Sequence, residues 1–308
     1  MAPLPKPVSS TVRAIYAAYE AANQQYDSLG ISVGDIGTEC DRALFYNFRW
    51  ASPPEVIDGR KLSIFRTGDR WEEVLVADLE AIGCDVFGQQ DRIRLLSGHV
   101  RGKCDGRATG FPEAPVTEHL VEFKSSNEAN FKQIVKLGCK AANLKHYGQV
   151  QIGMHAFGLT RAAYLAVNKN TDERYFERIE YDAEWCLRQL ARLDRIINAS
   201  EPPSRISENP EFFGCRLCKH KGICHGGDFP RVTCRVCIHA TAEMGGDGHW
   251  SCARWSKPNS TDEQKSGCPA MLFIPAMVPG EQIDVDEENE TITYRMPDGT
   301  LWTDGATQ

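Results

Sequence analysis

The 308-residue sequence lacks any apolar run of the about 18 residues that a membrane span needs. Its opening, MAPLPKPVSSTVRAIY, also lacks the charged segment followed by an apolar segment that marks a secretory signal. With 42% hydrophobic and 25% charged residues, the composition excludes a disordered chain, a collagen-like chain and a small disulfide scaffold. We therefore expect an unprocessed cytoplasmic protein with no membrane partner, long enough for two domains.

The sequence also has no excess of positive charge. It carries 35 Lys and Arg residues against 42 Asp and Glu residues, for a net charge of −7. An acidic chain cannot bind nucleic acid through its overall field, so such a partner would need a local basic groove. The candidates for that groove are Arg42, Arg66, Arg70, Arg92, Arg94, Arg101, Lys103, Lys132, Lys136, Lys140 and Lys145.

Hydrophobic periodicity predicts a mixed α/β fold. We expect a first helix that ends at Gly30 and, after a turn, a second helix within 31–50 with Asp35 or Thr38 as its cap. Further helices are expected over 64–84, 130–157 and 182–199. Alternating patterns predict strands within 85–110 and 119–126, and a hairpin over 161–181. From Pro202 the chain is rich in Cys, Gly and Pro without periodicity, and a hairpin around Pro297-Asp298-Gly299 ends it.

Three acids and a lysine lie in the strand-rich middle of the chain. Asp105 follows a predicted strand between glycines, while Glu122 and Lys124 are two residues apart on one strand and therefore share a face. Carboxylates that face one pocket are unfavourable unless a cation neutralises them. A divalent metal with a nearby lysine suits phosphodiester hydrolysis. The alternative is that these are ordinary solvated charges, because a short Glu-x-Lys is common.

GKCDG followed by VEFK resembles the D…(D/E)-x-K core of the PD-(D/E)XK nuclease superfamily. The likeness is greatest to its RecB-like exonuclease branch, which includes CRISPR-associated and phage recombination exonucleases. RTGDRWEE resembles the preceding helix motif of that branch, with Glu72 as the acid. HYGQVQIGMHAFG resembles the later helix motif, with Gln149 in place but Gly153 where the branch has a tyrosine.

This resemblance implies a restriction-endonuclease-like core, in which helices flank a mixed central sheet. It implies that Glu72, Asp105 and Glu122 bind Mg²⁺ or Mn²⁺ and that Lys124 assists the nucleophile. Gln149 would position the attacking water or the DNA backbone. All five residues would then belong to the catalytic site.

The sequence contains twelve cysteines, and seven of them crowd its last third. In a reducing compartment such clusters indicate metal sites. Cys215, Cys218 and Cys224 supply three thiolates, and the fourth ligand could be His220, His225 or the distant Cys40. Iron–sulfur members of the same nuclease branch carry one cysteine before the core and three after it in this C-x2-C-x5-C spacing. The resemblance therefore implies a [4Fe–4S] cluster on Cys40, Cys215, Cys218 and Cys224, which staples the domain ends together; a zinc site is the alternative.

The remaining cysteines divide into a second set and four isolated residues. Cys234, Cys237, Cys252 and Cys268 have spacings typical of zinc ribbons, although His239 or His249 could replace one of them, or the thiols could be free. We expect Cys84, Cys104, Cys139 and Cys186 to be packing residues, and His99 and His119 to lie on strand surfaces. The aromatic run of Phe45, Tyr46, Phe48 and Trp50 could stack on bases, but its helical spacing favours the core.

We therefore expect a nuclease domain over residues 1–228 and a zinc module over 229–308. The expected function is a Mg²⁺- or Mn²⁺-dependent DNA exonuclease that acts on single-stranded or duplex ends in recombination, repair or phage DNA processing. The resemblance also implies a phage source, the host cytoplasm as location, a recombination or replication partner protein and an oligomer. The alternative is a non-catalytic adaptor that keeps the fold, which Gly153 and the acidic pI favour.

Overall fold

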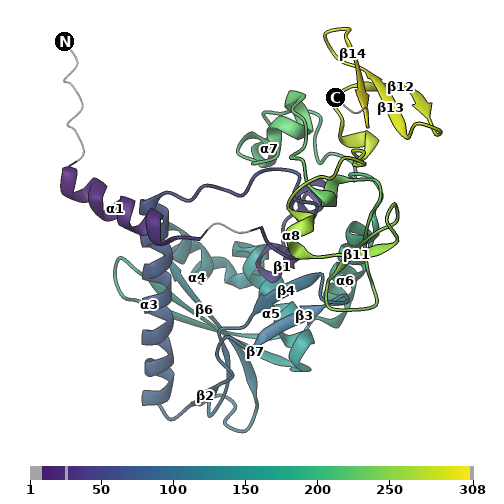
Figure 1. Ribbon diagram of the computed structural model, residues 1–308. Coiled ribbons are helices and arrows are strands. Elements are labelled where there is room, and N and C mark those ends of the chain that lie inside the picture. Colours follow the sequence, from purple (N-terminus) through teal and green to yellow (C-terminus); the bar gives the residue numbers. More distant parts are fainter. Residues whose placement is uncertain (1–8, 25–26, 306–308) are drawn as a thin grey trace, which may run out of the picture.

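The computed structural model describes residues 9–24 and 27–305, and a mixed five-stranded sheet forms its centre (Figure 1). The strand order is β2-β5-β6-β7-β8. Only β6 and β7 run parallel, and the other neighbours are antiparallel. This sheet confirms the expected mixed α/β class. Its strands are β2 (Asp85–Phe87), β5 (Gly106–Thr109), β6 (His119–Ser126), β7 (Arg161–Asn168) and β8 (Arg174–Glu180).

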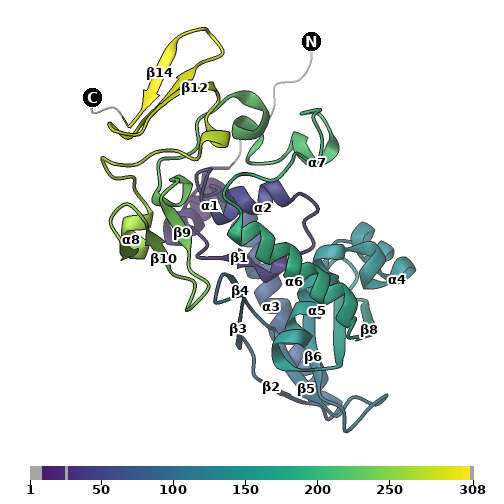
Figure 2. The ribbon, with the colours of Figure 1, turned by 90° about the vertical axis from the view of Figure 1, so that its right-hand side faces the viewer.

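Helices cover both faces of this sheet (Figures 1 and 2). On one face, Leu75 and Leu79 of α3 (Gly59–Ala81) pack with Val121 and Phe123 of β6. The other face carries α4 (Glu128–Ala142) and α5 (Leu144–Phe157), and α6 (Ala183–Asn198) packs against α5. Because side chains alternate along a strand, Leu120 joins the core on that second face. Glu122 and Lys124 share the register of Leu120 and therefore point the same way.

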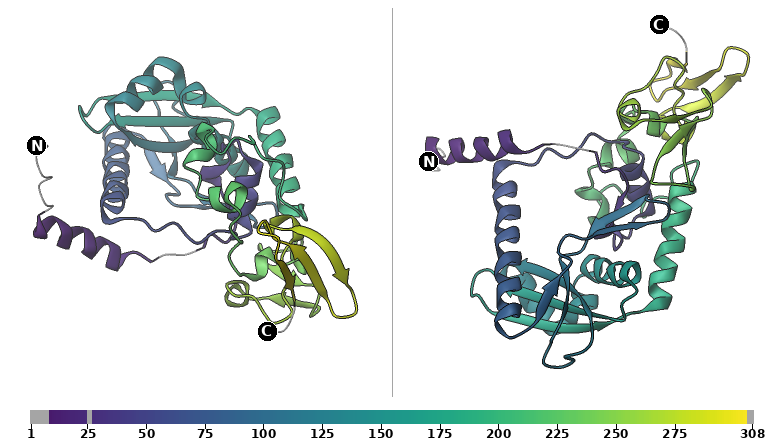
Figure 3. Two further views of the ribbon diagram at one scale, coloured as in Figure 1. Left: turned by 90° about the horizontal axis from the view of Figure 1, so that it is seen from above. Right: turned by 60° about the horizontal axis from the view of Figure 1, so that its bottom comes forward.

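The N-terminal part forms a smaller layer beside this core. Helix α1 (Ser10–Ala22) projects from the body beside α3 and buries none of its residues (Figure 3). A three-stranded sheet follows in the order β1-β4-β3, in which β1 runs parallel to β4. Its elements and neighbours are β1 (Ile31–Ser32), the turn η1 (Val33–Asp35), α2 (Asp41–Phe48), β3 (Arg92–Leu95) and β4 (Val100–Lys103).

The cysteine-rich region folds as short elements around two further small sheets (Figure 2). The first sheet comprises β9 (Ala240–Ala242), β10 (Trp250–Cys252) and β11 (Lys257–Asn259), and the second comprises β12 (Glu281–Asp286), β13 (Thr291–Arg295) and β14 (Leu301–Asp304). The short helical elements are α7 (Phe213–Arg216), η2 (Gly222–Gly226), η3 (Cys234–Val236), α8 (Thr261–Gln264) and η4 (Pro275–Met277).

Most expected elements are present, with shifted boundaries. Helix 182–199, the hairpin 161–181 and the C-terminal hairpin are confirmed as α6, β7–β8 and β13–β14. The opening helix ends at Ala22 rather than at Gly30. Neither proposed cap of α2 is correct, because Asp35 lies in η1 and α2 begins only after Cys40.

Two other expectations were wrong for reasons of backbone and packing. The stretch 130–157 is two helices that part at Asn143, whose backbone is extended and whose side chain caps α5 by accepting from the Lys145 and His146 N–H groups. Within α4, Gly138 has a φ of 74° and kinks the helix. His99 and His119 are fully buried rather than on the surface. His99 packs between Phe48 and Trp250, and His119 packs against Phe111.

The isolated cysteines and the aromatic run behave as expected. All four isolated cysteines are buried, and so are Phe45, Tyr46, Phe48 and Trp50. The aromatic run is therefore core and does not offer free faces to bases. Within the part of the chain that the structure describes, no helix combines the length and the apolar character required to cross a membrane.

Two buried arginines join the cysteine-rich region to the helices of the core, and we call this pair the arginine clasp. Arg49, just after α2, donates to the carbonyls of Arg235 at 3.1 Å and Ala240 at 3.2 Å. In return, Arg235 donates to the carbonyl of Phe48 at 2.9 Å, and its guanidinium stacks 3.7 Å from the ring centre of Trp50. Burial lowers the pKa of Arg49 to about 10 and that of Arg235 to about 9. The clasp thus holds two buried charges by carbonyls and aromatic faces alone.

Replacing Arg235 should strongly destabilise the protein. In Arg235→Ala the carbonyls of Phe48 and Leu29 and the amide of Gln264 lose their donor inside the core. Together with the lost packing, we expect a loss of about 3 kcal/mol or more in the free energy of unfolding, measured by urea titration. The control is Arg295→Ala, whose ion pair with Glu281 is exposed and should contribute less than about 1 kcal/mol. Equal effects of the two substitutions would contradict a structural role for the clasp.

Candidate active site and cysteine clusters

Asp105 and Glu122 lie side by side at the junction of β5 and β6. Gly106 pairs with Val121 in the antiparallel ladder, so the next pair along the two strands is Asp105 and Glu122. The Asp105 Oδ2 accepts a 2.7 Å hydrogen bond from the Phe123 N–H, which fixes this carboxylate against β6. Burial raises the pKa of Asp105, and the charge of Lys124 opposes that rise.

Glu122 is the most deeply buried acid of the group, with 2% of its side chain exposed. It forms an ion pair with Lys124, whose side chain is 22% exposed, yet its Oε1 has no hydrogen-bond donor with proper geometry. Burial raises the pKa of Glu122 to about 8, although Lys124 counteracts this. For Lys124, burial alone would lower the pKa, but the carboxylates of Glu122 and Asp105 raise it. Glu122, Asp105 and Lys124 together therefore carry more carboxylates than cations.

Glu72 reaches the same cluster from α3. Its Oε1 accepts a 2.8 Å hydrogen bond from the amide of Gln90, and its pKa is raised by burial and by the charge of Asp105. Gln90 is a residue that sequence reasoning missed. It lies in the turn before β3 with a φ of 61°, and the two glutamines of that turn carry no pattern that would single it out. Three carboxylates from α3, β6 and the start of β5 thus lie near one another beside one lysine.

This donor set fits a divalent cation. Hard oxygen ligands are what Mg²⁺ and Mn²⁺ prefer. Burial raises the pKa values of all three acids, so a bound cation would stabilise their charged forms. The Glu122 carboxylate is already paired with the Lys124 ammonium, and a metal ion would share it with that lysine. Glu72, Asp105 and Glu122 are therefore the residues that would hold such an ion.

Gln149 lies on α5 and is half-buried. One turn before it, His146 lies near Lys124: burial lowers the pKa of His146 to about 3, and the charge of Lys124 contributes. The Nδ1 of His146 also lies 2.8 Å from the Tyr164 hydroxyl, and Tyr164 pairs with Glu122 in the sheet. The first half of α5 therefore borders the carboxylate cluster.

The glycine that departs from the family pattern has a packing explanation. A Cβ added to Gly153 would lie 2.6 Å from Cδ2 of Leu120, so helix α5 approaches β6 closely at this point. A tyrosine here would force the helix away from the sheet. The departure at Gly153 therefore follows from this packing, and it does not by itself show that the site is inactive.

The first four cysteines lie around one cavity. Cys40 comes from the start of α2, whereas Cys215, Cys218 and Cys224 come from the loops around α7 and η2. Burial raises the pKa of Cys215, and the charges of the other three thiols raise it further. The cavity lining includes no carboxylate, but it includes the cations Arg42, Arg205 and Lys221. A group of thiolates beside several cations fits a metal cluster that carries net negative charge.

The two histidines near these cysteines differ. Both ring nitrogens of His220 are engaged, one 2.8 Å from the Ser52 hydroxyl and the other 3.1 Å from the Asn47 amide oxygen. This excludes His220 as the fourth ligand in this arrangement. The Nε2 of His225 is buried without a partner and lines the cavity.

The second four cysteines also lie together. Burial raises the pKa of Cys234 to about 11, and the charges of Cys268, Cys237 and Cys252 add to the rise. All four line one small cavity. Burial raises the pKa of Cys237, and the backbone N–H groups of His239 and Leu272 near its sulfur oppose that rise. Such N–H···S contacts suit a metal-bound thiolate. His239 lines the cavity as well, whereas His249 is exposed and does not.

Within residues 9–24 and 27–305, no three His, Cys, Asp or Glu side chains are arranged so that they could hold a metal ion as they stand. Both cysteine sets and the carboxylate cluster are gathered, but none converges on a single point. Metal binding by any of them would therefore require the side chains to move inward.

No protein-family model matches the chain, and no curated protein matches it. Among solved structures, the chain is similar to the alkaline exonuclease LHK-Exo from Laribacter hongkongensis, with 14% identity and a TM-score of 0.43 over 58% of this chain and 90% of that chain. It is also similar to LHK-Exo in complex with dAMP, with 14% identity and a TM-score of 0.42 over 60% of this chain and 90% of that chain. For SSO0001 the identity is 14% and the TM-score 0.39, over 70% of this chain and 96% of that chain. With TM-scores this low, function has to be argued from this chain's own residues.

The carboxylate cluster should make the protein more heat-stable in the presence of Mn²⁺. An ion that binds only the folded state adds about 2.7 kcal/mol of stability at a hundredfold excess over its Kd. We expect Mn²⁺ to raise the Tm of protein whose carboxylate cluster is metal-free by several degrees, measured by differential scanning fluorimetry. In Glu122→Gln the increase should be lost. Glu118→Gln, which changes a nearby acid that pairs with Arg107 outside the cluster, should keep it; loss in both variants would reject the assignment.

Proposed function

We propose that this protein is a divalent-metal-dependent DNA nuclease of the exonuclease type. The observation that carries the proposal is that Glu72, Asp105 and Glu122 lie near one another beside Lys124, at positions where burial raises the pKa values of all three carboxylates. These four residues are also the ones that the sequence motifs single out. A metal-dependent phosphodiester hydrolase is the function that this donor set supports best.

When bound, a divalent ion at this cluster would polarise the phosphoryl oxygen and lower the pKa of the attacking water. The chain's own residues have separate tasks. Lys124, held by Glu122, would place its ammonium beside the phosphate and offset the charge that develops there. Gln90 holds Glu72 in place, and Phe123 does the same for Asp105, so two carboxylates are oriented by neighbouring N–H groups. Gln149 would orient the water or the strand from α5.

The proposal extends to the cysteine sets. The cation-lined cavity supports a [4Fe–4S] cluster on Cys40, Cys215, Cys218 and Cys224, and the N–H···S contacts support zinc on Cys234, Cys237, Cys252 and Cys268. We propose residues 1–228 as the nuclease domain and 229–308 as the zinc module. A phage source, DNA recombination or repair as the process, the host cytoplasm as location and a replication or recombination partner remain parts of the same proposal.

Removal of the lysine or of a carboxylate should abolish cleavage and leave the fold intact. In Lys124→Ala and Asp105→Ala we expect at least a hundredfold loss of Mn²⁺-dependent digestion of linear DNA, measured on single-stranded and duplex substrates. The brown colour of the iron–sulfur form should persist, which shows that the loss is not unfolding. Digestion at the wild-type rate by either variant would mean that the active-site assignment is wrong. Absence of cleavage by the metal-loaded wild type would instead favour the non-catalytic adaptor.

The two cysteine sets should lose different metals. Cys40→Ser should abolish iron and sulfide content and the broad visible absorbance of anaerobically purified protein, with zinc retained. Cys237→Ser should lower zinc instead, and Cys186→Ser, which changes a buried cysteine outside both sets, should change neither. Metal analysis together with the visible spectrum measures all three. Zinc at the first set, or loss of both metals from Cys186→Ser, would contradict the assignment.

A further inference from the structure

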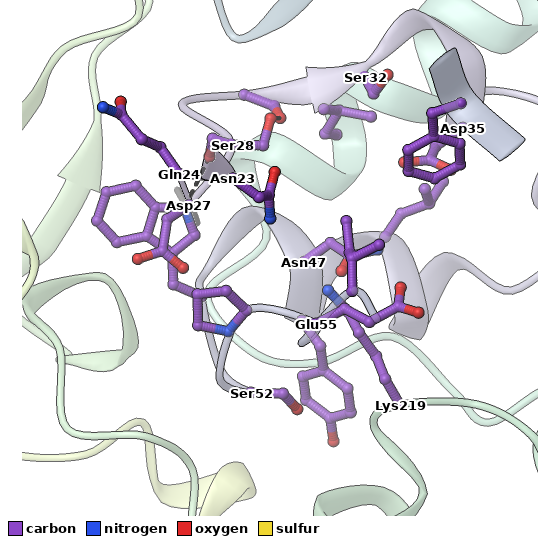
Figure 4. Close-up of a pocket in the computed structure, with 18 of the residues that line it drawn as sticks. Asn23, Gln24, Asp27, Ser28, Ser32, Asp35, Asn47, Ser52, Glu55 and Lys219 are labelled. Carbon is purple, nitrogen blue, oxygen red and sulfur yellow. Dashed lines mark hydrogen bonds between the residues drawn. The ribbon is translucent and has the colours of Figure 1, made fainter. Parts of the chain in front are cut away.

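A cavity of about 390 Å³ opens beside the segment that joins α2 to α3 (Figure 4). Its lining mixes amide, hydroxyl and aromatic side chains with aliphatic ones and three acids, and it includes Ser32, Asn47, Trp50, Phe65 and Lys219. None of the residues of the carboxylate cluster or of the cysteine sets lines it. The cavity is therefore separate from the sites described above.

Among the described residues that line this cavity, the acids are paired and one cation is not. Its three acidic residues are each held in an ion pair, and these pairs are Asp27–Arg231, Asp35–Lys145 and Glu55–Lys61. Lys219 is exposed and forms no ion pair with any residue among those that the structure describes. A cavity that combines paired acids, hydrogen-bonding side chains, aromatic rings and one unpaired ammonium suits a ligand that carries a phosphate and a planar group with hydrogen-bonding edges.

Helix α3 leads from this cavity to the carboxylate cluster. Phe65 and Glu72 are two turns apart and therefore lie on the same face of the helix, with their Cα atoms about 10 Å apart at 1.5 Å per residue. Phe65 is 49% exposed, so its ring is available for stacking. Gly68 lies between them, and a Cβ there would meet no atom within 4 Å, which leaves this strip of the surface open.

We propose that the cavity binds one nucleotide of the strand that is being cleaved, about one or two nucleotides from the scissile phosphate. The base stacks on Phe65, and a phosphate of the same strand lies at Lys219. The strand passes over the open surface at Gly68 between this cavity and Glu72. This inference rests on the proposed nuclease function, and it adds a nucleotide-binding site that favours unpaired over paired DNA.

The test is an abasic scan on protein that binds but does not cut. Single-stranded oligonucleotides, each with one abasic position, are titrated against Asp105→Asn by fluorescence anisotropy. We expect one position near the scissile phosphate to weaken binding at least about fivefold. In protein that also carries Phe65→Ala, binding of the intact oligonucleotide should weaken by a similar factor. The abasic position should then have no further effect on binding, because the stacking contact is already lost.

Lys219 gives an independent measurement on the same background. Lys219→Ala should reduce the salt dependence of binding by about one phosphate contact, whereas Lys257→Ala, which changes a lysine paired with Glu263 in the cysteine-rich region, should not. A flat abasic scan, or one that Phe65→Ala leaves unchanged, overturns the nucleotide site while wild-type cleavage keeps the nuclease proposal. If the wild type neither binds nor cleaves DNA, the nuclease proposal itself fails.

Discussion

The arginine clasp is the interaction on which the rest of the structure depends. Arg49 donates to the carbonyl of Arg235, Arg235 donates to the carbonyl of Phe48, and the ring of Trp250 lies beside both guanidiniums. A buried guanidinium without a carboxylate partner is unfavourable unless its N–H groups are satisfied and its planar faces are covered. Five backbone carbonyls, one side-chain amide oxygen and several aromatic rings meet most of this need here, and among the described residues the Nε of Arg49 is left without an acceptor. The cysteine-rich region is therefore packed into the core of the molecule rather than attached to it by a flexible linker.

The charges around two of the candidate metal sites are opposite in sign. At the carboxylate cluster the acids outnumber the single lysine, and burial raises the pKa values of Asp105 and Glu122. Around Cys40 and its three partners the lining holds cations and no acids. A hard cation suits the first arrangement, because it supplies the missing positive charge. A thiolate-bound cluster suits the second, because its net negative charge meets positive residues.

Sequence reasoning recovered what depends on local pattern and missed what depends on tertiary contact. The two-residue spacing of Glu122 and Lys124 sets a common face, and the spacing of Cys215, Cys218 and Cys224 sets a common loop, so both groups could be read from the chain. The clasp could not, because Arg49 and Arg235 look like surface residues until Phe48, Trp50 and Trp250 enclose them. Gln90 was missed for the same reason, since only the fold brings its turn to Glu72.

Helix α2 connects these features physically. Cys40 stands directly before it and faces the first cysteine set, while Arg49 stands directly after it and binds the loop of the second set. From its middle, Tyr46 and Asn47 line the polar cavity beside α3. An eight-residue helix has little stability of its own, so its position is set by the contacts at its two ends. The two cysteine sets thus lie at the contacts that position this helix, and the helix in turn forms part of the wall of the cavity beside α3.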